Sequence, residues 1–131
     1  RGMRGCGYIS IDRSNRMSAF KSLAEAATKI RIGVSVLIFP EGTRSLDGKI
    51  LPFKKGGFVL SVDAGVPIVP IIIFNTWSIM PKGRLRIRTQ SVRMNILAPI
   101  PTSGYTRETK DDLMDTVRNT ICNAFEEKVH E

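Results

Sequence analysis

Apolar residues recur at regular spacings along the first third of the chain. From Met17 to Ile30 they return every three or four residues, which predicts a helix that stops at Gly33. Residues 34–39 are apolar at all but one position, as expected of a strand buried on both faces. A shorter strand is predicted at residues 8–11. A strand, a helix and a second buried strand predict a βαβ unit with parallel strands.

The remaining elements follow from the same patterns. A short helix is predicted at residues 57–64 with Gly65 as its cap, and a buried strand at residues 68–74, with Pro70 at an edge, bulge or strand end. Residues 92–97 alternate as in a strand, and residues 109–112 resemble a capping box before the last helix. We therefore expect an α/β fold, with a mixed, largely parallel sheet flanked by helices, in which residues 1–131 form a single domain.

Charge narrows the choice of partners. Twenty Lys and Arg against twelve Asp and Glu give a net charge of +8, which favours nucleic acid, acidic lipid headgroups or phosphorylated small molecules. Two cysteines far apart suggest reduced thiols, and a single histidine, His130, argues against a metal site with His ligands. The longest apolar stretch, residues 66–74, is too short to cross a membrane, so no spanning helix is predicted.

Candidate chemistry begins where the strand at residues 34–39 ends, in the sequence Phe-Pro-Glu-Gly-Thr-Arg-Ser at residues 39–45. The carboxyl end of a parallel strand is a common ligand site. There Gly42 allows close backbone approach, and Arg44 offers a fork that matches a phosphate. Thr43 and Ser45 add hydroxyls, while Glu41 could orient Arg44 or accept from a substrate hydroxyl. The alternative is a solvated loop with an ordinary ion pair.

Three further stretches invite a functional interpretation. Asp12 and Arg13 follow the strand at residues 8–11, so two arginines could converge on one phosphate; alternatively Asp12 caps the next turn and Arg13 is a surface charge. Residues 54–57, Lys-Lys-Gly-Gly, could form a further anion contact or only a basic turn. Residues 66–71, which contain Pro67 and Pro70, look like core packing when taken alone.

Taken together, these motifs resemble the glycerolipid acyltransferase family, which has four sequence blocks. The second block resembles residues 7–13, ending in Ile-Asp-Arg. The third matches residues 39–45 at every position, and the fourth, Val-Pro-Ile-x-Pro-Val, matches residues 66–71 with Ile71 in the last place. The likeness spans essentially the whole chain, and it is greatest to the bacterial members that act on 1-acyl-glycerol 3-phosphate.

The resemblance implies an acyl transfer in phospholipid biosynthesis, producing phosphatidic acid. An acyl group passes from acyl-CoA or acyl carrier protein, as co-substrate, to the free hydroxyl of lysophosphatidic acid or glycerol 3-phosphate, with no other cofactor and no metal. It assigns Arg13 and Arg44 to the acceptor phosphate, with Thr43 and Ser45 beside them. It also implies that Glu41 and Gly42 shape the glycerol pocket. Asp12, Pro67 and Pro70 have supporting roles, the prolines in the adjoining wall and the acyl path.

The first block of the family, His-x-x-x-x-Asp, supplies the general base, and it is missing from this chain. No histidine precedes residue 7, and His130 is followed by one residue. We therefore expect no catalytic residue in this chain, which would be the C-terminal part of an acyltransferase domain that begins upstream and would transfer acyl groups poorly or not at all. The resemblance also implies a membrane surface on the cytoplasmic side as the place of work.

Two other functions are compatible with the sequence. One is a non-catalytic protein that binds lipid phosphates. The other is a basic nucleic-acid-binding module, which the low aromatic content of 7% and the lack of a recognition-helix pattern make a weaker fit, so no nucleic acid is expected as a partner.

Overall fold

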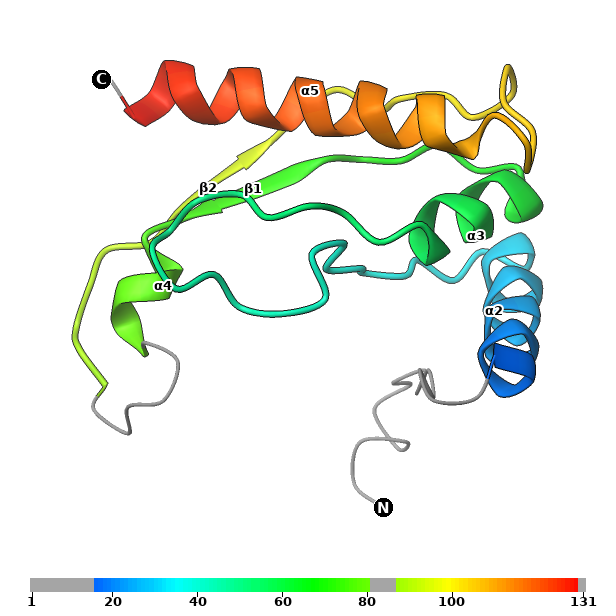
Figure 1. The fold of residues 1–131 in the computed structure, drawn as a ribbon, viewed down its shortest axis with the longest axis horizontal. Coiled ribbons are helices and arrows are strands. Elements are labelled where there is room, and N and C mark those ends of the chain that lie inside the picture. The colour runs from blue at the N-terminus through cyan, green and yellow to red at the C-terminus, as the bar shows by residue number, and fades with distance from the viewer. Residues whose placement is uncertain (1–15, 81–86, 130–131) are drawn as a thin grey trace.

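The computed structural model describes residues 16–80 and 87–129 of the chain. The predicted strand at residues 8–11 and the motif residues Asp12 and Arg13 lie outside this part. The described elements are, in chain order, α2 (Arg16–Arg31), α3 (Gly56–Ala64), β1 (Ile71–Phe74), α4 (Thr76–Ile79), β2 (Arg93–Ile96) and α5 (Lys110–Val129). In Figure 1 the long helix α5 runs along one side of the molecule, and α3 lies between it and α2.

The first core cluster joins α2 to α3. Ala26 and Ala27 of α2 are buried against Leu60 of α3, with Leu23 and Ile30 packed around them. Small alanine side chains let two helix backbones come close, because little side-chain volume separates them. Three residues of the predicted helical stripe, Leu23, Ala27 and Ile30, lie in this cluster, whereas Ala24 of the same stripe is exposed and the buried Ala26 was not predicted.

The second core cluster joins α3 to α5. Leu113 is fully buried, with 0% of its surface exposed, and it packs with Val117 of the same helix and Phe58 of α3. Phe53 stacks on Phe58 with ring centroids 6.2 Å apart. The predicted apolar stripe of the last helix thus supplies Leu113 and Val117 to the core, with Ile121 packed against them.

The two described strands pair in an antiparallel sheet, with Ile71 opposite Ile96 and Phe74 opposite Arg93. One face lies toward α5, where Phe74 stacks on Phe125 with centroids 5.3 Å apart. The other face carries the side chains that alternate with these, and all four are exposed: Ile71, Ile73, Met94 and Ile96. These four residues form what we call the outer face of the sheet.

The predicted parallel sheet is not confirmed, and the prediction of a buried strand at residues 34–39 is wrong. These residues form neither helix nor strand, and the exposed fractions of Leu37 and Phe39 are 70% and 69%. A strand is stable only when its N–H and C=O groups pair with a neighbouring strand. The described residues supply none for this segment. Hydrophobicity alone therefore did not determine its structure.

The helix ends and the strand end that were predicted from glycine and proline are confirmed. Gly33 has a φ of 96° and its N–H bonds to the Ile30 carbonyl, while Val34 bonds to Lys29, which closes α2 as predicted. Gly65 caps α3 in the left-handed conformation with a φ of 68°. Pro70 stands directly before β1, one of the three predicted positions. Of the helices in the described ranges, none has the length and apolar character to cross a membrane.

Candidate functional site

The loop after Phe39 folds back on itself through three hydrogen bonds donated by backbone N–H groups. The Gly42 N–H donates to the Phe39 carbonyl over 3.1 Å, and the Lys54 N–H donates to the Pro40 carbonyl over 2.7 Å. The Leu51 N–H donates to Oε2 of Glu41 over 2.7 Å. Gly42 takes a φ of 69°, which is strained for any residue with a Cβ. The sequence from residue 40 to residue 54 is therefore a closed loop leading into α3.

This closed loop borders a pocket of about 360 Å³. Three consecutive motif residues lie on one side of it and the return segment of the loop on the other. The lining residues are Glu41, Gly42, Thr43, Leu51, Pro52 and Lys54. The structure thus brings together three of the predicted site residues, along with a lysine from the basic turn at residues 54–57.

The next two motif residues point elsewhere. Nη1 of Arg44 donates to the Met80 carbonyl at the end of α4, over 3.2 Å. Oγ of Ser45 donates to Asp47 over 3.1 Å and accepts from the Gly48 N–H over 3.0 Å. Hydrogen bonding to Asp47 from the Lys49 backbone first, and from Ser45 after it, lowers the pKa of this exposed carboxyl. Arg44 therefore connects the loop to the end of α4, and Ser45 stabilises the turn at residues 45–48. Neither residue lines the pocket.

The two prolines of the fourth motif also lie outside the pocket lining. Pro70 is buried and its carbonyl accepts from the Leu97 N–H over 3.0 Å, while Pro67 is exposed. Between them Ile68 forms an isolated bridge with Ile100. Pro67, Val69 and Ile71 are exposed, so the interpretation of this segment as core packing holds for only part of it.

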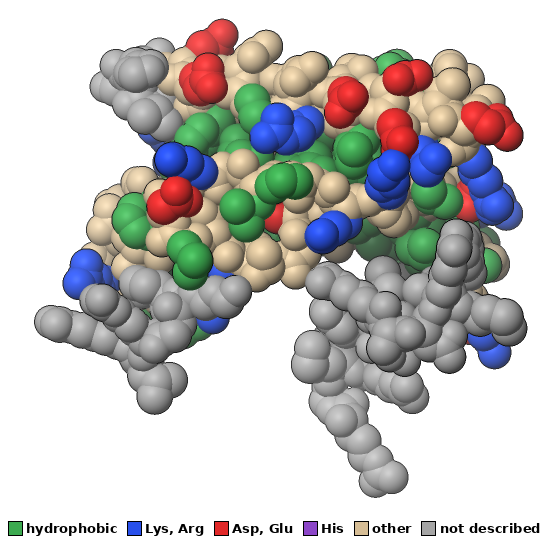
Figure 2. Space-filling model, viewed as in Figure 1, with side chains coloured by type: hydrophobic (Ala, Val, Ile, Leu, Met, Phe, Trp, Pro, Cys, Tyr) green, Lys and Arg blue, Asp and Glu red, His purple; other side chains and the backbone are tan. Residues whose placement is uncertain are grey.

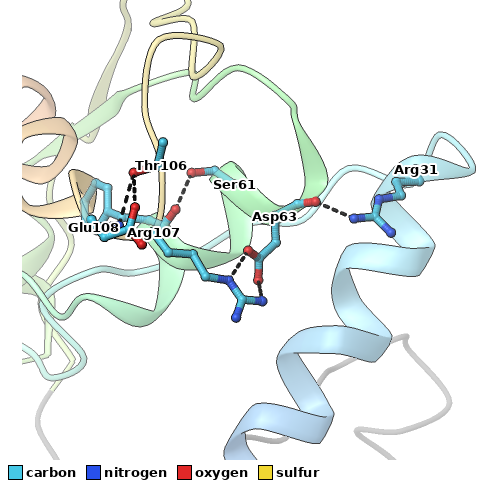
Figure 3. A network of polar contacts seen from close by, with 7 residues as sticks. Arg31, Ser61, Asp63, Thr106, Arg107 and Glu108 are labelled. Carbon is cyan, nitrogen blue, oxygen red and sulfur yellow. Dashed lines mark hydrogen bonds and ion pairs between the residues drawn. The ribbon is translucent and has the colours of Figure 1, made fainter.

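A second, smaller hollow of about 250 Å³ lies between α2 and α3. Asp63 of α3 is one of its lining residues. Its carboxylate accepts two bonds from Arg107, at 2.6 and 2.8 Å, and its backbone carbonyl accepts one from Arg31 (Figure 3). The bidentate contact with Asp63 raises the pKa of Arg107. Through this network, Arg107 in the segment before α5 is bonded to α3, and α3 is bonded to the end of α2.

Sequence reasoning missed this second network because its members lie 32 and 44 residues apart. It also missed the bond between Glu41 and the Leu51 N–H. Within the described ranges no group of three or more His, Cys, Asp and Glu residues is placed to hold a metal ion.

Comparison with known proteins agrees with the motifs. The family model "Acyltransferase" matches residues 1–74. The chain therefore belongs to the Acyltransferase family.

Relatives within the family are named more specifically. The chain is 38% identical over 122 residues to the 1-acyl-sn-glycerol-3-phosphate acyltransferase alpha of Homo sapiens, covering 92% of this chain and 43% of the human protein. It is 40% identical over 113 residues to the 1-acyl-sn-glycerol-3-phosphate acyltransferase of Limnanthes douglasii, covering 86% of this chain and 40% of the plant protein. The chain thus spans about two fifths of the length of these relatives.

A solved structure shares the fold. The 1-acyl-sn-glycerophosphate acyltransferase PlsC from Thermotoga maritima superposes with a TM-score of 0.74 at 37% identity, over 82% of this chain and 46% of the PlsC chain. The chain therefore shares the acyltransferase fold of the matching part of PlsC, although a largely parallel sheet is not confirmed.

Proposed function

We propose that this chain is part of a 1-acyl-sn-glycerol-3-phosphate O-acyltransferase, in which it binds the acceptor of the acyl group. The observation that carries the proposal is the pocket formed by Glu41, Gly42 and Thr43 with the return segment of the loop. These residues belong to the motif that most specifically marks the family, and the named relatives act on 1-acyl-glycerol 3-phosphate. An acid, a hydroxyl and open backbone suit an acceptor that carries both hydroxyl and phosphate groups.

The proposed roles follow from the geometry. Glu41 has one carboxylate oxygen bonded to the Leu51 N–H, so the carboxylate is held in a fixed position from which to accept from a glycerol hydroxyl. Arg44 follows Thr43 directly, and its bond to the Met80 carbonyl uses one of the five N–H groups of a guanidinium. Arg44 and Ser45 therefore remain proposed phosphate contacts at the outer end of the loop.

Acyl transfer requires a base for the attacking hydroxyl, and residues 1–131 do not include the His-x-x-x-x-Asp block. We propose that residues 1–131 bind and orient the acceptor, and that the general base and most of the contacts to the acyl-CoA or acyl carrier protein come from other parts of the protein. General-base catalysis and positioning are separate contributions, so binding can survive where transfer does not.

We propose that the protein acts at the cytoplasmic face of a membrane. The net charge of +8 supports association with an anionic surface. Figure 2 shows acidic side chains over α5 and basic side chains below them on the same face. Each Lys or Arg near an anionic leaflet is worth about 1 kcal/mol. We expect the chain to float with anionic liposomes at low salt and to be released at high salt.

The proposal is tested by titrating the 131-residue chain with glycerol 3-phosphate and a short-chain lysophosphatidic acid, alongside an assay with an acyl thioester. We expect saturable binding of a phosphate acceptor without robust transfer. If neither acceptor binds, the proposal is overturned. Robust acyl transfer would overturn the claim that the general base comes from other parts of the protein. Salt-dependent binding to DNA in place of the acceptors would instead support the nucleic-acid alternative.

A further inference from the structure

The pocket beside the closed loop holds one lysine, and its setting differs from that of the neighbouring lysine. Lys54 lines the pocket. Lys55 instead turns to α5, where its Nζ lies 2.7 Å from Oδ2 of Asp111. Lys54 makes no ion pair with any residue in the ranges 16–80 and 87–129. Lys54 therefore adds a basic residue to the lining of the pocket, and no described acidic side chain forms an ion pair with it.

The backbone fixes Lys54 in this place. Its N–H donates to the Pro40 carbonyl over 2.7 Å, which holds the lysine across the loop from the residue that precedes Glu41. The helix α3 begins two residues later, at Gly56, so the backbone after Lys54 is held as well. A side chain whose base is fixed loses less entropy on binding than one on a mobile loop.

The lining of one pocket thus includes an acidic residue, Glu41, and a basic residue, Lys54, from the two ends of the closed loop. A carboxylate on Glu41 repels a ligand that is anionic throughout, whereas an ammonium on Lys54 attracts a phosphate. A ligand with a hydroxyl at one end and a phosphate at the other satisfies both groups. Arg44 bonds to the Met80 carbonyl and lies outside the lining, so its proposed contact with the phosphate would come from the outer end of the loop, in addition to that of Lys54.

We propose that Lys54 contacts the phosphate monoester of the acceptor in this pocket, and that it determines specificity for phosphorylated acceptors. This inference rests on the proposed function. It adds a phosphate-binding residue that lies outside the family motif at residues 39–45. The chemistry is that of a compact, strongly hydrated cation, which binds phosphate as a point charge without the bidentate geometry of arginine.

The test compares Lys54→Gln with Lys49→Gln in the full 131-residue chain. Both changes remove one positive charge from the same loop, but Lys49 is 83% exposed, lies 3.6 Å from Asp47 and does not line the pocket. Calorimetric titrations use glycerol 3-phosphate, short-chain lysophosphatidic acid and inorganic phosphate. We expect Lys54→Gln to weaken binding of both phosphate monoesters by about tenfold or more, as for a charge-assisted hydrogen bond. The affinity of Lys49→Gln for both phosphate monoesters should stay within about twofold of that of the unsubstituted chain. Lys54→Arg should recover part of the loss.

Each outcome bears on one claim. If the unsubstituted chain binds the acceptors and Lys54→Gln behaves like Lys49→Gln, the role of Lys54 is overturned while the proposed function stands. If the unsubstituted chain binds neither acceptor, the proposed function fails and the role of Lys54 fails with it. If inorganic phosphate binds as tightly as glycerol 3-phosphate, the pocket is a plain anion site, and the claim of acceptor specificity is overturned.

Discussion

The carboxylate of Glu41 accepts the N–H of Leu51 over 2.7 Å and so joins the two ends of a ten-residue loop. Glu41→Ala leaves that partly buried N–H without its charged acceptor, which costs about 1–3 kcal/mol. We expect faster amide hydrogen exchange at Leu51, weaker acceptor binding, and a fall in the free energy of unfolding of up to about this amount. Glu41→Gln keeps an acceptor oxygen, so the Leu51 amide should exchange more slowly in this variant than in the alanine variant. Equal exchange in all three proteins would contradict this role of Glu41.

Arg44 links the family motif to the end of α4 through the Met80 carbonyl. Arg44→Ala should weaken binding of glycerol 3-phosphate about tenfold, because an exposed charge-assisted contact lies near the lower end of its usual range, about 1.5 kcal/mol. Titration calorimetry measures the change. Arg118→Ala, in α5 and outside the pocket lining, is the control with the same loss of charge. Unchanged affinity in the Arg44 variant would remove it from the phosphate site.

Gly48 lies against Trp77, the single tryptophan of the chain. An added Cβ at Gly48 would be 2.6 Å from Nε1 of Trp77, and the φ of 82° disfavours any side chain by about 1–2 kcal/mol. We expect Gly48→Ala to displace Trp77 and to shift its fluorescence. Gly104→Ala, where nothing lies within 4 Å, should leave the emission unchanged. Matching spectra for the two variants would show that the loop does not rest on Trp77.

The ion pair between Lys55 and Asp111 should make stability depend on pH. The hydrogen bond from Lys55 lowers the pKa of Asp111 below its ordinary value of 3.8. A lowered folded-state pKa means that the contribution is complete above 3.8 and is lost as pH falls through the folded pKa. We expect urea midpoints of the unsubstituted chain to fall more steeply at acid pH than those of Lys55→Gln. Parallel pH profiles would contradict the contribution of this pair.

Leu113 and Ile96 provide a matched test of which surfaces are core. Leu113 has 0% of its surface exposed, and Leu113→Ala should cost about 2–5 kcal/mol of unfolding free energy. Ile96 on the outer face is 59% exposed, and Ile96→Ala should cost less than about 1 kcal/mol. Chemical denaturation measures both. A comparable loss in the two variants would mean that the outer face is covered in solution.

Features that depend on nearby residues could be predicted from the sequence. Gly33 and Gly65 end their helices because a left-handed residue closes a helix through bonds within about six residues. The stripe through Leu113 and Val117 was predicted because helical periodicity depends on spacing alone. The family motif likewise indicated three residues that the structure brings together in one pocket.

Features that depend on distant partners could not be predicted. Residues 34–39 have the composition of a buried strand, but strand formation also requires a neighbour, and composition does not supply one. The pairing of residues 71–74 with residues 93–96 is antiparallel, although the sequence suggested a largely parallel sheet. Glu41 was expected to orient Arg44 or meet a substrate, and its bond to Leu51 depends on how the whole loop closes.

The outer face has a practical consequence for work with this protein in solution. Four large apolar side chains lie on a sheet of two strands, and each strand has one edge without a strand neighbour among the described residues. Such surfaces favour intermolecular sheet extension and precipitation. The net charge of +8 opposes this through mutual repulsion between molecules, and salt screens that repulsion. Colloidal stability should therefore be greatest in dilute, low-salt buffers, where the protein's own charge keeps its molecules apart.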